Sequence, residues 1–243
     1  MIKRKLRFGA SFVFALVLAQ LASEFSRAND LTTSVGYYSQ GSIREASALP
    51  LQGTGFVKIF ANRARYYGSA EITSLIVDSA KELQKRFPSP DRIQIADLSA
   101  QKGGFIGGHV SHQNGLDADI AFIRLNQTEQ PPRFDQTKNH GFQEVFVKNG
   151  KISENFDALR NWELIRILFE SGKVQRIFMD QEIKQSLCRH LKATNQLLHY
   201  KNIVSRIRIE SDHTAHMHVR LYCPKGNSEC KAQPDRVFDL GCM

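Results

Sequence analysis

Two short segments far apart in the chain carry most of its histidines. The first runs from Gly107 to Asp119 and the second from His213 to Leu221, and together they hold five of the eight histidines and two carboxylates. Imidazole and carboxylate groups are the ligands that zinc and similar metals prefer. Any fold for this chain must therefore bring the two segments together, and that requirement limits the possible folds more than any other feature of the sequence.

The second segment alternates in the manner of a β-strand. Alternate side chains of a strand share a face, so His216 and His218 would point one way with Arg220, and the apolar residues between them would point the other way. Residues Asp117–Ile123 predict a second strand, and His112 precedes it in a glycine-bounded loop. We therefore expect a metal site on the face of a sheet, anchored by the apolar face.

The ligand types indicate the metal. A His-x-His pair on a strand is by itself more often a surface feature than a ligand pair. Together with His112 and Asp119, however, it supplies the two histidines and one carboxylate of a catalytic zinc site that keeps one position open. Spacing alone does not say whether His216 or His218 is the ligand. Imidazole nitrogens favour zinc over magnesium and calcium, which prefer oxygen shells, and iron is the alternative.

The first residues have the pattern of a signal peptide. Residues 3–7 are rich in Lys and Arg, residues 8–22 are mostly apolar, and Ser26-Arg27-Ala28 is a suitable cleavage site. The apolar run is short for a membrane span, and an uncleaved anchor is the alternative. We predict a signal peptide over residues 1–28, export without stable membrane insertion, and a single domain over residues 29–243.

Charge and cysteine content fit an exported protein. The formal net charge is +9, part of it in the leader, and the remainder would favour an anionic partner such as a wall polymer. No basic stripe with interleaved aromatics is present, so nucleic acid is not an expected partner. The sequence does not indicate an oligomeric state.

Four cysteines in an exported chain favour two disulfides. Cys223 and Cys230 flank the turn-rich stretch Pro224-Lys225-Gly226-Asn227, which favours a local bridge between them. That bridge leaves Cys188 to pair with Cys242.

Helix and strand signals predict an α+β fold. Helices are expected from Ser69 to Phe87, from Leu159 to Ser171 and after Asp180, because apolar residues recur at helical spacing and capping residues mark the ends. Further strands are expected near residues 92–98, 174–179 and 203–209, with a hairpin around Asn149-Gly150. Residues 29–56 are expected to be irregular. Central strands with flanking helices imply a mainly antiparallel sheet that carries the zinc site.

Two motifs resemble those of the penicillin-insensitive murein endopeptidases, relatives of lysostaphin, the D-Ala-D-Ala metallopeptidases and the hedgehog domain. The resemblance lies in Gly107-Gly108-His109-Val110-Ser111-His112-Gln113-Asn114-Gly115-Leu116-Asp117-Ala118-Asp119 and in His216-Met217-His218-Val219-Arg220-Leu221-Tyr222-Cys223-Pro224. Weaker agreement at residues 49–53 and 183–188 extends it over most of the exported chain. It implies a periplasmic zinc D,D-endopeptidase that hydrolyses D-alanyl to meso-diaminopimelyl cross-links in peptidoglycan.

The resemblance also implies roles for single residues. The zinc ligands would be His112, Asp119 and His218; His216 would be the base for metal-activated water, His213 a second active-site histidine, and His109 a further histidine near the metal. The family's disulfide pairing is the one given above. Its pattern has Asp-Gly-Lys-His where this chain has Asn149-Gly150-Lys151-Ile152, so we expect one zinc ion per chain and regard a second as doubtful.

Three other functions compete with this one. Ser99-Ala100-Gln101-Lys102 fits the Ser-x-x-Lys pattern of serine penicillin-binding enzymes, although the companion motifs are missing. A non-catalytic wall-binding module would have the same fold but would be expected to have lost ligands. A D,D-carboxypeptidase that trims stem ends would have the same site, and the sequence does not separate it from an endopeptidase.

Overall fold

The computed structural model describes residues 32–130, 141–235 and 239–242. The predicted signal peptide at residues 1–28 lies outside the described residues. Within the described ranges, no helix combines the length and the apolar character needed to cross a membrane.

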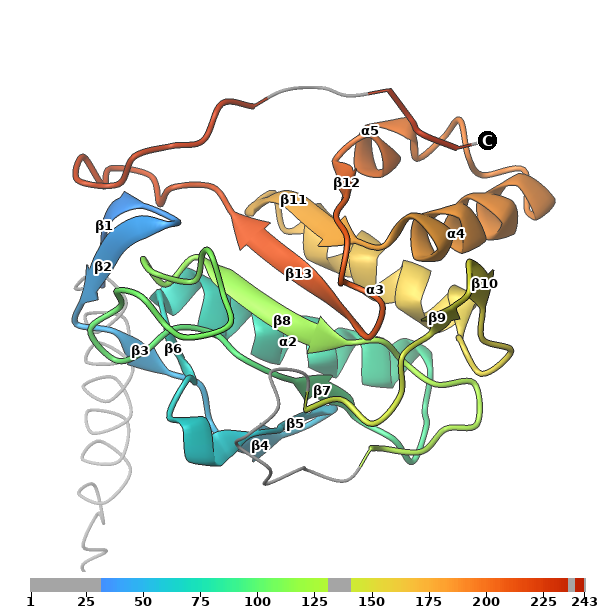
Figure 1. Ribbon diagram of the computed structural model, residues 1–243, viewed down its shortest axis with the longest axis horizontal. Coiled ribbons are helices and arrows are strands. Elements are labelled where there is room, and N and C mark those ends of the chain that lie inside the picture. The colour runs from blue at the N-terminus through green and yellow to red at the C-terminus, as the bar shows by residue number, and fades with distance from the viewer. Residues whose placement is uncertain (1–31, 131–140, 236–238, 243) are drawn as a thin grey trace, which may run out of the picture.

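A seven-stranded sheet forms the centre of the fold (Figure 1). In spatial order its strands are β12 (Ile207–Ile209), β11 (Val174–Met179), β13 (His216–Leu221), β8 (Asp117–Ala121), β7 (Ile93–Ile95), β5 (Phe56–Lys58) and β4 (Gln52–Gly53). Four neighbouring pairs are antiparallel, while β11 with β12 and β5 with β7 are parallel. The structure thus confirms the predicted α+β fold with a mainly antiparallel sheet.

The two strands of the histidine-bearing segments, β8 and β13, are neighbours in the middle of this sheet. Their inner side chains, including Ala118, Ile120, Met217 and Val219, are at most 1% exposed and belong to the main hydrophobic core. Because side chains alternate along a strand, the polar residues between them emerge together on the opposite face.

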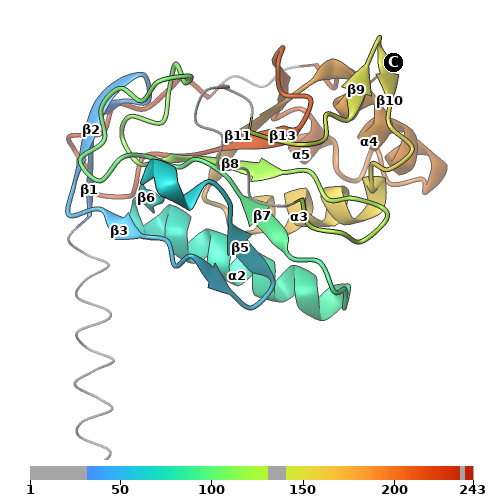
Figure 2. The ribbon, with the colours of Figure 1, turned by 60° about the horizontal axis from the view of Figure 1, so that its bottom comes forward.

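Helices cover the apolar side of the sheet. They are α2 (Ala70–Arg86), α3 (Ala158–Glu170), α4 (Gln181–Ala193) and the short α5 (Lys201–Val204). Figure 2 shows α2 and α3 lying beneath the sheet. The first three begin at capping side chains, because Ser69, Asp157 and Asp180 each accept a hydrogen bond from a backbone N–H of the first turn. The three predicted helices are confirmed, although the cap Asp157 was not predicted.

The prediction that residues 29–56 are irregular is wrong for the described part. Strands β1 (Thr33–Tyr37) and β2 (Gln40–Arg44) form a hairpin, and β3 (Ser47–Ala48) pairs with β6 (Tyr67–Gly68). The hairpin also bonds a distant segment, since Gly36 donates to Glu229 and accepts from Lys231 through backbone groups. The two strands pair locally, but the Tyr38-Ser39 turn between them is not the Asn-Gly or Asp-Gly pair that marks a hairpin in a sequence, which explains the error.

Two local predictions had different outcomes. The expected hairpin exists as β9 (Val147–Lys148) and β10 (Lys151–Ile152), with both Asn149 and Gly150 at positive φ as its tight turn requires. The strand expected over residues 203–209 is wrong at its start, because residues 201–204 form α5 and the strand begins at Ile207.

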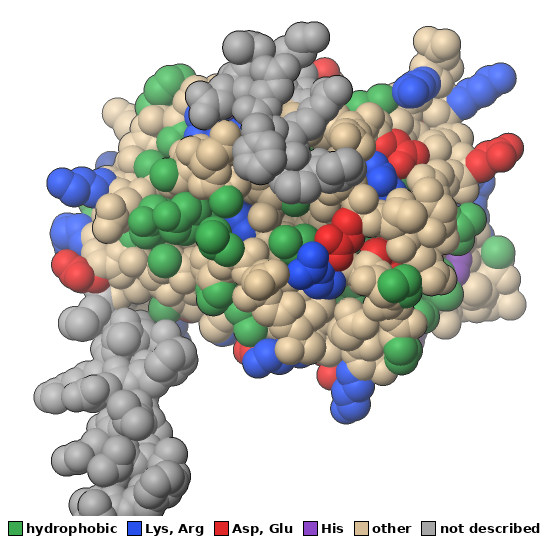
Figure 3. All heavy atoms as spheres, turned by 90° about the horizontal axis from the view of Figure 1, so that it is seen from below, with side chains coloured by type: hydrophobic (Ala, Val, Ile, Leu, Met, Phe, Trp, Pro, Cys, Tyr) green, Lys and Arg blue, Asp and Glu red, His purple; other side chains and the backbone are tan. Residues whose placement is uncertain are grey.

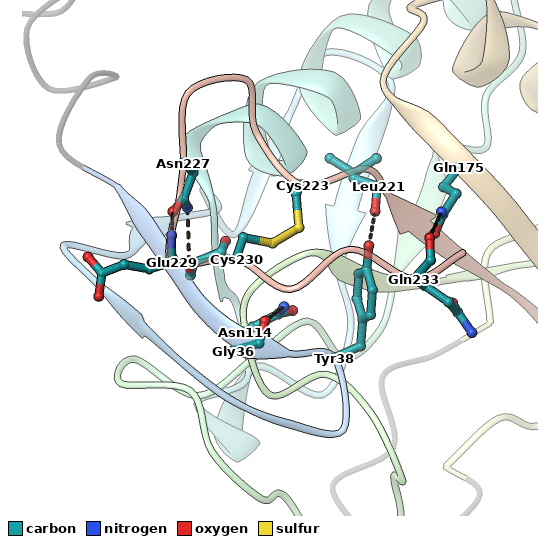
Figure 4. The surroundings of a disulfide bond; sticks show 11 residues. Gly36, Tyr38, Asn114, Gln175, Leu221, Cys223, Asn227, Glu229, Cys230 and Gln233 are labelled. Carbon is teal, nitrogen blue, oxygen red and sulfur yellow. Dashed lines mark hydrogen bonds between the residues drawn. A yellow bond between two sulfur atoms is a disulfide. The ribbon is translucent and has the colours of Figure 1, made fainter. Parts of the chain in front are cut away.

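Both disulfides join the pairs favoured by the sequence. Cys188 bonds Cys242, and Cys223 bonds Cys230. Figure 4 shows the second bridge beside the β1–β2 hairpin, where the Tyr38 hydroxyl donates to the Leu221 carbonyl at 2.9 Å. The bridge and this hydrogen bond hold the hairpin against the end of β13, beside the histidines of that strand.

Charged side chains are dispersed over the surface drawn in Figure 3. Lys and Arg are interspersed there with Asp and Glu, with no single basic patch on that face. This pattern is typical of a solvated surface and gives no sign of a polyanion-binding stripe on the face shown.

Candidate metal centre

The histidine-bearing segments meet where β8 pairs with β13. In the antiparallel register, Asp119 lies directly opposite His218, so their side chains leave the sheet as neighbours on one face. His112 reaches the same point from the loop before β8. Its backbone has φ of 68°, an uncommon conformation for a residue with a side chain, and it aims the imidazole inward, where the residue is 0% exposed.

Three possible ligand atoms form a compact triangle. His112 Nε2 lies 3.2 Å from His218 Nδ1 and 3.3 Å from Asp119 Oδ1, and His218 Nδ1 lies 3.3 Å from the same oxygen. Ligands at about 2.0 to 2.1 Å from a tetrahedral zinc ion are separated by distances of this size. The triangle therefore has the dimensions of a three-ligand metal site.

Neighbouring hydrogen bonds fix which histidine nitrogens are unprotonated. His112 Nδ1 lies 2.7 Å from the Leu98 carbonyl, which can only accept, so this nitrogen bears the proton and Nε2 presents a lone pair to the triangle. His218 Nε2 donates to the Asp117 carboxylate at 3.0 Å, so in the neutral ring Nδ1 is the nitrogen that has the lone pair. Two lone pairs thus face a carboxylate oxygen.

The facing lone pairs require a positive charge between them. Among the described residues, Asp119 Oδ1 is buried without a hydrogen-bond donor. Burial raises the pKa of Asp119, but His112, His216 and His218 as imidazolium cations outweigh it and hold the pKa well below its ordinary value, so the carboxylate is ionised beside positive charge. Metal-binding imidazoles are neutral, so a bound cation would supply that charge instead, and two imidazoles and one carboxylate here fit a zinc ion.

Asp117 supports the triangle from behind. It is 0% exposed and accepts hydrogen bonds from His218, from the His112 backbone N–H at 2.9 Å, and from Arg220 Nε at 2.7 Å and Nη2 at 3.2 Å. A carboxylate on the far nitrogen of a metal-binding histidine fixes its tautomer and its orientation. The sequence placed Asp117 on the strand but gave it no role. Its spacing of two residues from Asp119, on the same face, was the available signal.

His216 lies beside the triangle. Its Nε2 is 3.7 Å from Asp119 Oδ1, and its ring stacks on Phe142 with centroids 4.9 Å apart and an interplanar angle of 8°. Burial lowers the pKa of His216 to about 4, against the opposing effect of Asp119, so the imidazole is neutral at neutral pH and can accept a proton. The stacking partner Phe142, far away in sequence, was not predicted.

His213 and His109 flank this arrangement. The His213 ring is 4.9 Å from that of His216, and burial lowers its pKa. His109 Nδ1 is 3.6 Å from Asp119 Oδ2, while its Nε2 contacts Asp97 Oδ2 at 3.1 Å. His109 can also form a looser ligand group with His112 and Asp119, whose atoms lie within 4.8 Å of one another. The ligand atoms of His112, Asp119 and His218 lie closer together than those of this second group, and hydrogen bonds define the lone pairs of both histidines.

A cavity of about 490 Å³ opens next to these histidines. Its walls are the tip of the β1–β2 hairpin at Tyr37 and Tyr38, the loop from Gly108 to Ser111, and the segment from Glu210 to His213. Phe178, His218 and Arg220 also line it. A peptide-sized molecule in this cavity would have its backbone beside the triangle.

The Ser99–Lys102 pattern does not form a second catalytic site. Ser99 is 0% exposed, and its backbone pairs with Tyr67, whereas Lys102 is exposed. A buried hydroxyl held in this way is out of reach of a substrate, so the structure disfavours the serine mechanism.

Comparison with known proteins identifies relatives. Residues 34–243 match the family model described as penicillin-insensitive murein endopeptidase. The chain is 34% identical over 211 residues to the penicillin-insensitive murein endopeptidase of Klebsiella pneumoniae (strain 342), covering 86% of this chain and 73% of the relative. It is 32% identical over 217 residues, with the same coverages, to the protein of that name from Salmonella paratyphi B.

Proposed function

This chain belongs to the penicillin-insensitive murein endopeptidase family and is a metallopeptidase that hydrolyses peptidoglycan, and we propose that the bond it cleaves is the D-alanyl to meso-diaminopimelyl cross-link between peptide stems. We propose His112, Asp119 and His218 as the ligands of a single zinc ion. The observation that carries this assignment is the triangle of ligand atoms, which are 3.2 to 3.3 Å apart. In it, two histidine lone pairs face a carboxylate oxygen that accepts no hydrogen bond from the described residues.

Zinc bound at the triangle would supply a water of lowered pKa and would polarise the carbonyl of the amide. The residues of the chain supply the rest. His216 is neutral and accepts the proton of the attacking water at Nε2, which faces the triangle, and then returns it to the leaving amine. Phe142 holds the His216 ring by stacking, and Asp117 holds His218 in the tautomer that leaves Nδ1 free.

His213 completes the proton-handling group. Its Nδ1 lies 2.9 Å from the Ser211 carbonyl and so carries the proton there, which leaves Nε2 as the acceptor of the ring. We propose that His213 lies against the substrate in the cavity and assists His216, because it lines that cavity and its ring adjoins the His216 ring.

We further propose that the protein acts in the periplasm as a single domain over residues 29–243, after removal of residues 1–28. The two disulfides support this compartment, because such bonds persist in oxidising environments and are rare in the cytosol.

The test uses residues 29–243, purified with zinc and given cross-linked muropeptide dimers. The expected products, identified by mass spectrometry, are two monomeric stems, formed by the untreated protein and lost after a chelator is added. Asp119→Asn is the matched control and should leave the dimers intact. Release of a terminal D-alanine with the cross-link preserved would instead identify a D,D-carboxypeptidase, and intact dimers with zinc present would refute hydrolysis of this bond.

A further inference from the structure

We propose that Arg63 and Arg65 form a binding site for the free carboxylate that lies next to the scissile amide of the substrate. The inference rests on the proposed function, because it concerns the leaving half of the same cross-link. It starts from a buried carboxylate, Asp97, on one oxygen of which several cationic side chains converge.

Asp97 is 1% exposed, and three side chains converge on its Oδ2. Arg63 Nη1 and Arg65 Nη1 both donate to this oxygen at 3.0 Å, and His109 Nε2 lies 3.1 Å from it. The ammonium of Lys58 is also buried here, and Asp97 is the acidic group that most favours its charge. Arg63, Arg65 and Lys58 are therefore three cationic side chains near a single carboxylate. This cluster keeps an excess of positive charge.

Among the described residues, neither guanidinium uses all of its donors. The Arg63 side chain makes one hydrogen bond there and lies 4.2 Å over the Phe60 ring, while the Arg65 side chain uses only Nη1, which it shares between Asp97 and the Gly107 carbonyl. The side chains are 18% and 22% exposed, so an incoming group can reach them. A guanidinium with free N–H groups in a fixed orientation matches the planar geometry of a carboxylate.

The backbone holds this pair in place. Arg63 ends the short 3-10 helix η1 (Ala61–Arg63), and the residues on either side of η1, Phe60 and Ala64, have φ of 57° and 53°. Residues with a side chain seldom adopt this conformation, and here it turns Arg63 and Arg65 toward the same oxygen. A Cβ on Gly141 would approach Arg63 Nη2 to 2.9 Å, so the backbone of Gly141 packs closely against this guanidinium and helps to hold it.

The pair lies at a suitable place relative to the triangle. His109 contacts Asp97 through Nε2 and approaches Asp119 Oδ2 to 3.6 Å through Nδ1, so one imidazole ring separates the arginine-bound carboxylate from the ligand carboxylate. Neither arginine lines the 490 Å³ cavity. A substrate that fills the cavity with one stem and crosses the triangle would bring the other half of the cross-link toward the arginines.

The substrate has a carboxylate in the corresponding position. In the cross-link, the scissile nitrogen is attached to a carbon of diaminopimelate that also bears a free carboxylate, two bonds from that nitrogen. Pairing of this anion with Arg63 and Arg65 would orient the leaving nitrogen toward His216, which protonates it. The same pairing would select against cross-links in which this carboxylate is amidated.

The experiment compares two cross-linked dimers that differ only at this carboxylate, free in one and amidated in the other. We expect the wild-type protein to cleave the free form with a kcat/KM about tenfold to a hundredfold higher, the range for a charge-assisted hydrogen bond to a fixed anion. The double variant Arg63→Gln/Arg65→Gln should bring the ratio close to one, mainly by slowing the free substrate. Arg86→Gln, which removes a surface arginine of α2, should keep the wild-type ratio.

Two results would overturn the proposal. If the arginines only hold Asp97 and His109, the double variant will slow both substrates equally and leave the ratio unchanged. Equal cleavage of both dimers by the wild-type protein would also refute it, even if the variant does not fold, and would leave the proposed function intact. If neither dimer is cleaved, the proposed function fails, and calorimetric binding of the leaving stem, free against amidated, decides the subsite separately: tighter binding of the free form supports it, and equal binding refutes it.

Discussion

Asp117 and Asp119 lie two residues apart on one strand and face the same way, yet their surroundings are opposite. Asp117 accepts hydrogen bonds from Arg220, His218 and a backbone N–H, which satisfies both of its oxygens. Asp119 Oδ1 has no donor in the described structure and faces two histidine lone pairs. At this site the saturated carboxylate positions its neighbours, whereas the unsaturated one, which faces two histidine lone pairs, is where we propose that a cation binds.

The largest effect is expected from Asp119→Asn. Loss of the ligand charge should abolish zinc binding and lower turnover by about a thousandfold or more, since metal stabilisation of the transition state is worth several kcal/mol. Metal content by mass spectrometry and turnover of cross-linked dimers test both points. Retained zinc would show that Asp119 is not a ligand.

The variant His216→Ala tests whether His216, which also faces Asp119, is a general base and not a zinc ligand. We expect kcat to fall by about 10² to 10⁴, the usual contribution of a general base, while one zinc ion per chain is retained. His112→Ala is the matched comparison and should lose the metal as well. If His216→Ala also loses zinc, the 3.7 Å separation from Asp119 has been misjudged and His216 belongs to the ligand set.

The variant Asp117→Asn tests whether Asp117 positions His218 for zinc binding. Zinc affinity should fall by about 10-fold to 100-fold, because His218 loses the partner that orients it. The free energy of unfolding should fall by about 3 to 5 kcal/mol, because Arg220 is left buried without its anion. Adding Arg220→Met should restore much of the stability but not the affinity, as measured by urea titration and competition with a zinc dye. Unchanged zinc affinity in both variants would show that Asp117 does not position His218 for zinc binding.

The smallest effect concerns pH. Burial raises the pKa of Asp117, but Arg220 and His218 outweigh burial and hold it well below its ordinary value. A depressed pKa stabilises the fold above the pKa of the unfolded chain, and this stability is lost as pH falls toward the folded value. Metal-free wild type should therefore lose stability below about pH 4, near the pKa of an unfolded aspartate. Asp117→Asn should lose less over the same range, and parallel curves would contradict this.

The sequence predicted the parts of the site that depend on local spacing. Strand alternation placed His216 and His218 on one face, and the apolar residues between them are in the core as expected. The caps Ser69 and Asp180 located two helices within a residue or two of their observed ends. These features depend on neighbours in sequence, which is why reading along the chain was sufficient.

Partners that arrive from distant segments were missed. Phe142 stacks on His216, and Asp97 gathers Arg63, Arg65 and His109, although none of these contacts has a sequence pattern. The β1–β2 hairpin was missed for a different reason, because its turn at Tyr38-Ser39 lacks the usual sequence signal of a hairpin. The resemblance implied the ligand set, but only the hydrogen bonds to Leu98 and Asp117 reveal which histidine nitrogens are free.

The distance along the chain between His112 and His218 gives the metal site a further significance. These residues are 106 positions apart, so an ion that joins them closes a loop much longer than either disulfide does. In an unfolded chain, closing a loop of about 100 residues costs roughly 4.7 kcal/mol of entropy, so the two half-sites bind an ion weakly until β8 and β13 have paired. With the proposed ligands, metal loading would be a late step of folding, and a chain that is exported unfolded would acquire its ion only at its destination.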